Sequence, residues 1–256
     1  MRIFLAILAL GLARTALGAD GELAVGTGLH YSTGTYGGST QTQILSIPLT
    51  ARYDTDLWTF KAYVPYLEIN GDSNVIPGFG PVNGRGSSKR PAGERTRAAG
   101  MGDSTVSATY NVYGANSRSG LGLTGKLKLA SGDEHEGLGT GSNDLSFQVD
   151  AYQQVDRHTV FGVVGYTIFG DSPLGHADSV PNLGIGASRR LDSGDTLGVS
   201  FDMRQGGEPA PAPQRELTAF WTHRIGRAWR TQAYALKGFA RGSPDWGGGV
   251  SAAYVF

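Results

Sequence analysis

The sequence predicts an all-β membrane protein, an up-and-down antiparallel β-barrel of about twelve strands. Three observations support this prediction. Apolar and polar residues alternate with a period of two, short and long connections follow one another along the chain, and no segment after the N-terminus is long and apolar enough for a transmembrane helix. The 40 glycines, with many Thr, Ser, Tyr and Val residues, also favour strands over helices.

The N-terminal segment 1–19 has the features of a secretory signal peptide. A basic residue, Arg2, precedes an apolar run over residues 3–12, and the small residues Ala16, Gly18 and Ala19 follow. The run is shorter than the roughly twenty residues that span a bilayer, so we expect cleavage rather than a retained helix. Residues 20–256 would then form the barrel domain, located in the bacterial outer membrane.

The composition narrows the possible partners and cofactors. The chain has no cysteine, which removes disulfides and thiolate metal sites and suits export through an oxidising compartment. Its 22 basic residues balance 22 acidic residues, so nucleic acid is not an expected partner. No cofactor is predicted.

The alternation predicts strands at 22–32, 40–53, 57–68, 102–113, 119–130, 143–154, 158–169, 180–190, 195–204, 215–225, 228–238 and 247–256. The connections 54–56, 114–118, 155–157, 191–194 and 226–227 are short, and the others are longer. In outer-membrane barrels short connections are periplasmic turns and long ones are extracellular loops, so both chain ends would lie in the periplasm.

The longest extracellular loop is predicted near residues 70–101. It contains a basic cluster, Lys89, Arg90, Arg95 and Arg97. A solvated loop is the first expectation for such a segment. Contact with lipopolysaccharide, or an inward position that gates the pore, are the alternatives.

Each predicted strand has one apolar face and one polar face. Leu123 and Leu127, for example, alternate with Thr124 and Lys126. If the apolar faces meet lipid, the polar faces line the lumen. The predicted lumen-lining and transport residues are Lys61, Lys126, Lys128, Gln148, Asp150, Asp202, Arg204, Glu216, Arg230 and Gln232. Their mixed charges fit either a narrow polar channel or an interior closed by ion pairs.

Aromatic residues near strand ends are expected in girdles at the two membrane interfaces. They are Trp58, Tyr66, Tyr110, Trp221 and Trp229. The last segment alternates and stops at Phe256, which resembles the C-terminal strand that the outer-membrane assembly machinery recognises. The expected partners are therefore this machinery, outer-membrane lipids and lipopolysaccharide, and a small-molecule solute.

The segment 131–144 combines closely spaced glycines with four carboxylates, Asp133, Glu134, Glu136 and Asp144. The glycines do not open a helix within a βαβ unit, so dinucleotide binding is not expected. The carboxylates could hold Ca²⁺, but their spacing is not that of an EF-hand, and a solvated acidic loop is the favoured interpretation.

A family resemblance appears in the same region. The sequence runs from Leu129-Ala-Ser-Gly-Asp133 through Gly137-Leu-Gly-Thr-Gly-Ser-Asn-Asp144 into a strand that contains Gln148. Over residues 100–256 it resembles the outer-membrane family named after the MetA pathway of phenol degradation, with Ala130 in place of a common proline. The resemblance implies a transporter of small, often hydrophobic or aromatic compounds, and it carries over no catalytic residues.

Two other functions stay open at this point. Outer-membrane lipid or lipopolysaccharide hydrolases are small barrels with a His and a Ser two residues apart on one strand, and His30 and Ser32 have that spacing. The register places both on the lumen face, away from lipid, so we predict that the protein is not an enzyme. A sealed structural or adhesive barrel is the other alternative.

Overall fold

The computed structural model describes residues 21–72, 74–76, 79–81, 95–113, 117–208 and 210–256, so the predicted signal peptide lies outside the described residues. No helix in this part of the chain is long and apolar enough to cross a membrane. The strands are β1 (Glu22–Gly34), β2 (Thr42–Asp54), β3 (Trp58–Asp72), β4 (Val75–Ile76), β5 (Gly80–Pro81), β6 (Arg95–Met101), β7 (Ser104–Asn111), β8 (Ser119–Leu129), β9 (Asp144–Val155), β10 (His158–Ile168), β11 (Val180–Arg190), β12 (Thr196–Arg204), β13 (Gln214–Ile225), β14 (Trp229–Gly238) and β15 (Trp246–Val255).

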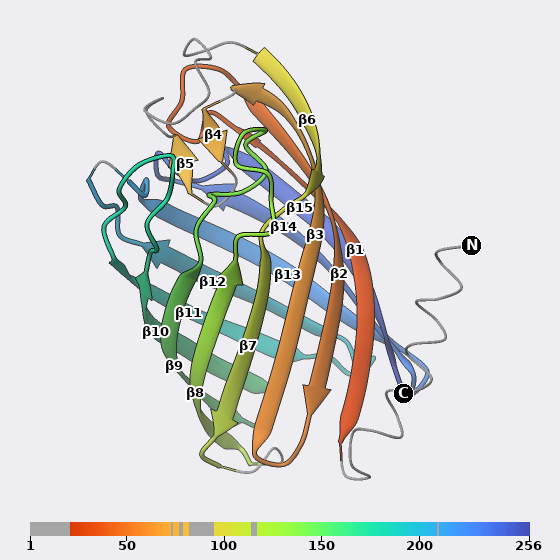
Figure 1. Ribbon diagram of the computed structural model, residues 1–256. Helices are drawn as coiled ribbons and strands as arrows, with labels where there is room; N and C mark the ends of the chain where they lie inside the picture. Colours follow the sequence, from red (N-terminus) through yellow and green to blue (C-terminus); the bar gives the residue numbers. More distant parts are fainter. Residues whose placement is uncertain (1–20, 73, 77–78, 82–94, 114–116, 209) are drawn as a thin grey trace.

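Thirteen of the described strands form one closed antiparallel sheet (Figure 1). β1 pairs with both β2 and β15, and β2 pairs with β3, which closes the barrel. β6 and β7 lie end to end along β3, so twelve strand positions surround the lumen. The predicted twelve-stranded barrel is confirmed, and β4 and β5 form a separate small hairpin.

The connections differ at the two ends of the barrel, which we call the short-turn end and the long-loop end. The described strands at the short-turn end are joined by 55–57, 112–118, 156–157, 191–195 and 226–228, and those at the other end by 35–41, 130–143, 169–179, 205–213 and 239–245. The predicted alternation of connections holds in general, although 112–118 at the short-turn end is as long as 35–41 and 239–245 at the other end. Gly226 and Asp156 adopt positive φ angles of 64° and 53°, as tight turns require.

The outward face of the barrel is an apolar belt. Leu49, Val160 and Ile185 point outward and are 58%, 55% and 57% exposed. Such surface is stabilised by roughly 25 cal/mol per Å² when water is removed, so hydrocarbon is its natural surrounding. The predicted girdle residues are also exposed on this face: Trp58, Tyr66, Tyr110, Trp221 and Trp229.

The predicted loop 70–101 contains more strand than the alternation indicates. β3 continues to Asp72, and β6 extends the neighbouring strand before its predicted start at residue 102. Arg97 lies on β6 and pairs with Glu68 at 2.6 Å, whereas Lys89 and Arg90 lie outside the described residues. A charged pair on the outer face of this extension removes the apolar alternation that marks a lipid-facing strand, so the pattern did not predict it.

A β-bulge separates β6 from β7. β6 pairs Met101 with Tyr66, and β7 pairs Thr105 with Tyr63, so three residues between these pairs face only two of β3. The inward face therefore changes from even-numbered residues of β6, such as Ala98, to odd-numbered residues of β7.

The loops pack together over the mouth at the long-loop end. One cluster of buried apolar side chains consists of Tyr36, Ile44, Leu67, Ile69, Val75, Ala98 and Leu138, and a second consists of Ile76, Phe79, Leu174, Ala177 and Ala210. The β4–β5 hairpin joins both clusters, because Val75 belongs to the first and Ile76 to the second, and each is only 2% exposed. The cover of the barrel therefore has a small apolar core of its own.

Inward-facing glycines make room for aromatic rings on one side of the lumen. Phe161 lies opposite Gly186, and Phe220 lies opposite Gly198. A Cβ at Gly198 would come within 2.2 Å of the Phe220 ring. Each ring packs over the glycine of the neighbouring strand and fills the space on that side of the lumen.

Candidate functional site

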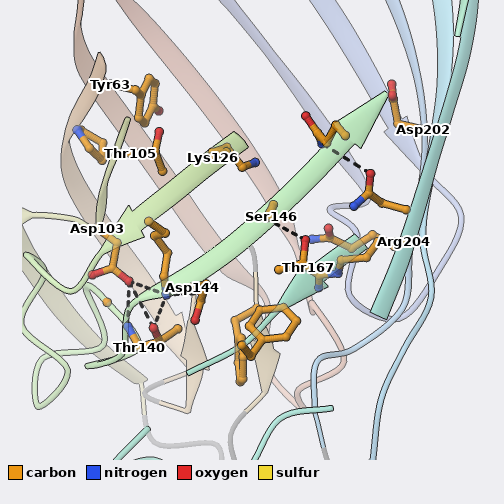
Figure 2. A pocket seen from close by; sticks show the side chains of 18 of the residues that line it. Tyr63, Asp103, Thr105, Lys126, Thr140, Asp144, Ser146, Thr167, Asp202 and Arg204 are labelled. Carbon is orange, nitrogen blue, oxygen red and sulfur yellow. Dashed lines mark hydrogen bonds and ion pairs between the residues drawn. The ribbon is translucent and has the colours of Figure 1, made fainter. Parts of the chain in front are cut away.

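The inward faces enclose two chambers, one toward each end of the barrel. The long-loop chamber has a volume of about 570 Å³ and is lined in part by Phe79 and Leu138 of the loop cover. Figure 2 shows side chains that line it. The short-turn chamber has a volume of about 460 Å³ and lies along β13, β14, β15, β1 and β2. Tyr63 of β3 lines both, so the chambers adjoin at this side chain.

The predicted lumen residues are distributed unevenly between the chambers. The long-loop chamber is lined by Lys126, Lys128, Gln148, Asp202, Arg204 and Glu216. The short-turn chamber is lined by Arg230 and Gln232. Lys61 and Asp150 lie on the inward faces of β3 and β9 but line neither chamber, and Asp150 accepts a hydrogen bond from Thr124 at 3.4 Å. A role of these residues in transport remains a prediction.

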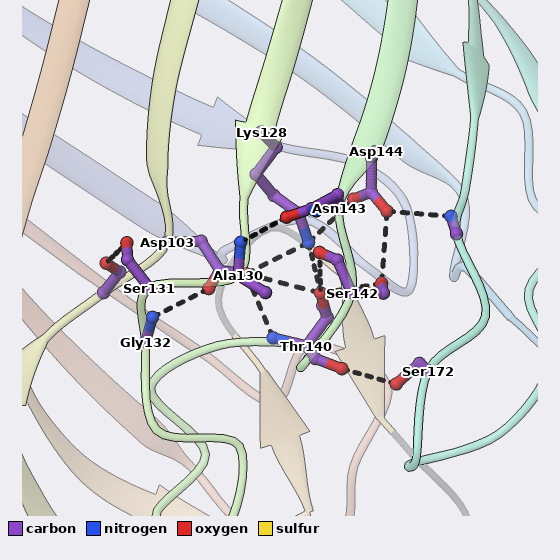
Figure 3. A network of polar contacts seen from close by, with 12 residues as sticks. Asp103, Lys128, Ala130, Ser131, Gly132, Thr140, Ser142, Asn143, Asp144 and Ser172 are labelled. Carbon is purple, nitrogen blue, oxygen red and sulfur yellow. Dashed lines mark hydrogen bonds and ion pairs between the residues drawn. The ribbon is translucent and has the colours of Figure 1, made fainter.

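Lys128 is the centre of a polar network in the wall of the long-loop chamber (Figure 3). Its Nζ lies 3.0 Å from Asp103 Oδ2 and 2.7 Å from Asp144 Oδ2, and it donates to Thr140. Asp103 also accepts hydrogen bonds from the backbone N–H groups of Gly132 and Thr140, both at 3.0 Å. Because both carboxylates share a cation and have further donors, their burial is compensated.

The same network fixes the segment 130–143, which carries the family-like motif. The N–H of Ala130 donates to Asn143 Oδ1 at 2.8 Å, and Ser142 Oγ donates to Asp144 at 3.2 Å. The N–H of Gly170, in the next loop, donates to the same carboxylate at 3.1 Å. Asp144 is only 5% exposed, so the interpretation of this residue as part of a solvated acidic loop is wrong.

The other acidic residues of this segment point elsewhere. Asp133 Oδ1 accepts hydrogen bonds from the N–H groups of His135 and Glu136, at 2.9 and 3.2 Å, which stabilises a turn. In the described part of the chain, no group of three or more His, Cys, Asp or Glu side chains is arranged to hold a metal ion. The geometry therefore does not support the calcium alternative.

Aromatic rings and charges share the long-loop chamber. Phe79 and Phe169 meet edge to face with their ring centroids 5.6 Å apart, and both line the cavity. The charged lining consists of Lys126, Lys128, Arg204, Asp103, Asp144, Asp202 and Glu216. Cations and carboxylates are thus nearly balanced around this space.

The short-turn chamber has smaller side chains and a different charge. Strand register places Arg224, Arg230, Ala253, Gly26 and Thr50 in one row across five neighbouring strands. The small residues in this row leave open space, and the arginines lie at one end of it. Among the described residues, no Asp or Glu lines the chamber.

The His30 and Ser32 side chains lie on the lumen face, as the register predicted, but they do not form a catalytic pair. His30 Nδ1 lies 2.9 Å from the hydroxyl oxygen of Tyr234. Burial raises the pKa of Tyr36 well above its ordinary value, so its hydroxyl stays protonated and donates to Ser32 Oγ at 2.6 Å. Each residue is therefore bonded to a tyrosine rather than to the other.

The lining residues that were not singled out from the sequence include Tyr63, Arg224 and Asp103. Tyr63 and Arg224 share the inward parity of Lys61 and Glu216, so the alternation could have identified them. Asp103 lies within the bulge, where one extra residue reverses that parity. Only the three-dimensional register identifies it.

A closed antiparallel barrel with an apolar exterior, aromatic girdles and a polar lumen defines the class of outer-membrane β-barrels. The model of the family described as "Putative MetA-pathway of phenol degradation" matches residues 14–206. The chain belongs to this family, which confirms the resemblance found in the sequence.

Solved structures with the same fold include an outer membrane channel from Pseudomonas putida F1, which has 16% sequence identity and a TM-score of 0.70 over 94% of this chain and 97% of that chain. The KdgM porin has 10% identity and a TM-score of 0.55 over 91% of this chain and 99% of that chain. A comparison with curated protein sequences finds no match. At these identities the likeness concerns the fold.

Proposed function

We propose that the protein is an outer-membrane channel for small solutes. The observation that carries this proposal is the pair of hollow chambers that adjoin at Tyr63, one beneath the loops and one toward the short turns. Side chains can fill the interior of an eight-stranded barrel, whereas a larger circumference leaves space. Together the chambers offer a route across the membrane that is lined by charged, polar and aromatic side chains.

The proposed solutes are small hydrophobic or aromatic compounds. The family description refers to phenol degradation. Phe169 and Tyr63 present ring surfaces to the long-loop chamber, on which an aromatic solute could stack. The polar lining, including Gln148, offers hydrogen bonds to a hydroxyl or carboxyl substituent.

A sealed structural or adhesive barrel is the second candidate, and one observation favours it. The two apolar clusters of the loop cover pack over the mouth and bury Val75 and Ile76. A channel requires this cover to open or to leave a gap beside it. A barrel that binds ligands with its loops does not.

The proposal assigns no enzymatic activity to the barrel and three kinds of partner besides solute. Lipids would cover the apolar belt, lipopolysaccharide would meet the long-loop end, and the assembly machinery would recognise the C-terminal strand. Phe256 is 41% exposed and packs edge to face on Tyr254, with centroids 4.9 Å apart, so its ring is accessible on the outer face.

Planar-bilayer recording tests the channel. The refolded barrel, checked by heat-modifiable migration, is reconstituted, and conductance is recorded with and without phenol and benzoate. Stable conductance steps that one of these solutes blocks are expected. A folded barrel that neither conducts nor passes solutes would favour the sealed alternative, whereas phospholipid turnover lost in Ser32→Ala would support the hydrolase.

A further inference from the structure

We infer that the short-turn chamber is a binding site for a small organic anion, a carboxylate attached to an aromatic body. This inference rests on the proposed channel function and deepens it by naming a class of solute. The argument depends on the arginine pair, on the rest of the lining, and on the contrast with the long-loop chamber.

The two arginines of the chamber lie directly opposite each other. Register pairs Arg224 of β13 with Arg230 of β14, and both face the chamber. Side chains so placed have Cβ atoms about 5 Å apart, and like charges in this position repel. Arg230 is paired with Glu22. The Arg224 side chain makes no hydrogen bond or ion pair within the described part of the chain, so the pair of arginines carries one positive charge that no carboxylate balances.

The remaining lining fits the rest of such a ligand. Thr222, Gln232 and Ser251 lie in the row next to the arginines and can donate hydrogen bonds to a second carboxylate oxygen. Beyond them, His30 and Tyr63 offer ring surfaces to an aromatic body. Planar guanidinium groups bind carboxylates with two parallel hydrogen bonds, which makes arginine the suitable cation here.

The long-loop chamber is expected to bind an anion more weakly than the short-turn chamber. Three cations line it against four carboxylates, and Lys128 is held between two of those carboxylates. The short-turn chamber has two arginines in its lining and no carboxylate among the described residues. A carboxylate that enters from the loops would therefore gain binding energy only after it passes Tyr63.

Calorimetric titration of benzoate into the folded barrel, residues 20–256, in detergent tests the site directly. Arg224→Gln should bind benzoate about tenfold more weakly, because one charge-assisted hydrogen-bond pair is lost. Arg224→Lys keeps the charge but loses the planar guanidinium group, so its affinity for benzoate should lie between those of the native chain and Arg224→Gln. The control is Arg227→Gln, which removes the same charge from the turn outside the chamber and should leave the affinity unchanged.

Benzyl alcohol has a similar ring without the charge and should bind weakly and equally to all variants. Three results would contradict the proposed anion site: the native barrel does not bind benzoate, Arg224→Gln binds it as tightly as the native chain, or Arg227→Gln loses as much affinity as Arg224→Gln. Bilayer conductance distinguishes the two proposals. If the barrel binds benzoate through Arg224 but does not conduct, the anion site is supported and the channel function is rejected. If the barrel conducts but its benzoate binding does not depend on Arg224, the channel function is supported and the anion site is rejected.

Discussion

The long-loop and short-turn chambers are built from the same alternating strands, but they use charge in opposite ways. Around the long-loop chamber, Lys128 joins Asp103 to Asp144 and thereby holds the segment 130–143 against the wall. Around the short-turn chamber, Glu22 pairs with Arg230, and the Arg224 side chain opposite has no carboxylate partner within the described part of the chain. Buried and paired charges brace loops, whereas an unbalanced charge is available to a ligand.

The comparison shows that the sign of a charge in the lumen does not decide whether that side chain stabilises the structure or can contact a solute. Lys126 and Lys128 lie two residues apart on one face of β8, yet only Lys128 forms ion pairs within the described residues. The number of partners, which depends on neighbouring strands and loops, separates a structural charge from one that a solute can meet.

The largest expected effect comes from Lys128→Met. It leaves Asp103 and Asp144 without their cation, and breaking a buried ion pair in this way costs about 3–5 kcal/mol. Denaturant unfolding in detergent should show this loss, and bilayer recordings should show larger or less stable currents as the segment 130–143 is released. Lys126→Met is the control and should change stability by less than about 1 kcal/mol. Equal losses would contradict the distinction between the two lysines.

The next largest effect on stability is expected where an inward-facing glycine makes room for an aromatic ring. Gly198→Val should destabilise the barrel by about 1–3 kcal/mol, because its side chain would displace the ring of Phe220. Gly125→Val serves as the control, since a Cβ at Gly125 meets no atom within 4 Å. Unfolding curves that coincide for both variants would show that the ring of Phe220 moves aside without cost.

Removing the side chain between the chambers should change transport more than stability. Tyr63→Ala should raise single-channel conductance, because the two chambers would merge, and it should cost less than about 1 kcal/mol of stability at this partly exposed position. Tyr66→Ala, on the lipid face of the same strand, is the matched control and should leave the conductance unaltered. A current insensitive to Tyr63→Ala would mean that solutes do not pass this side chain.

The smallest effect is expected outside both chambers. Arg97 and Glu68 pair at 2.6 Å, but the Arg97 side chain is 72% exposed. Arg97→Gln should therefore change the unfolding free energy by only about 0–1 kcal/mol, and benzoate binding should not change. A substantial loss of binding would show that charge beyond the chambers governs anion entry.

Much of the barrel could be predicted from the sequence because a strand exposes one face to hydrocarbon and the other to a polar lumen. That requirement produced the alternation around Leu123 and Lys126, and it located the girdle tryptophans. It did not extend to the loop cover, where the burial of Val75 and Ile76 depends on contacts among segments distant in sequence. The pairing of Lys128 with Asp103 was missed for the same reason.

The single extra residue between β6 and β7 has a further consequence for comparing and engineering such chains. Deleting Gly102 would restore one continuous register along β3, and the side chains on one side of the deletion would then exchange inside for outside. Either the apolar contacts of Ala98 in the loop cover or the position of Thr105 in the lumen would be lost. Sequence alignments that treat the whole length of this strand as one repeating pattern will therefore misassign half of its residues, and gaps placed here change the orientation of side chains rather than the length of a loop.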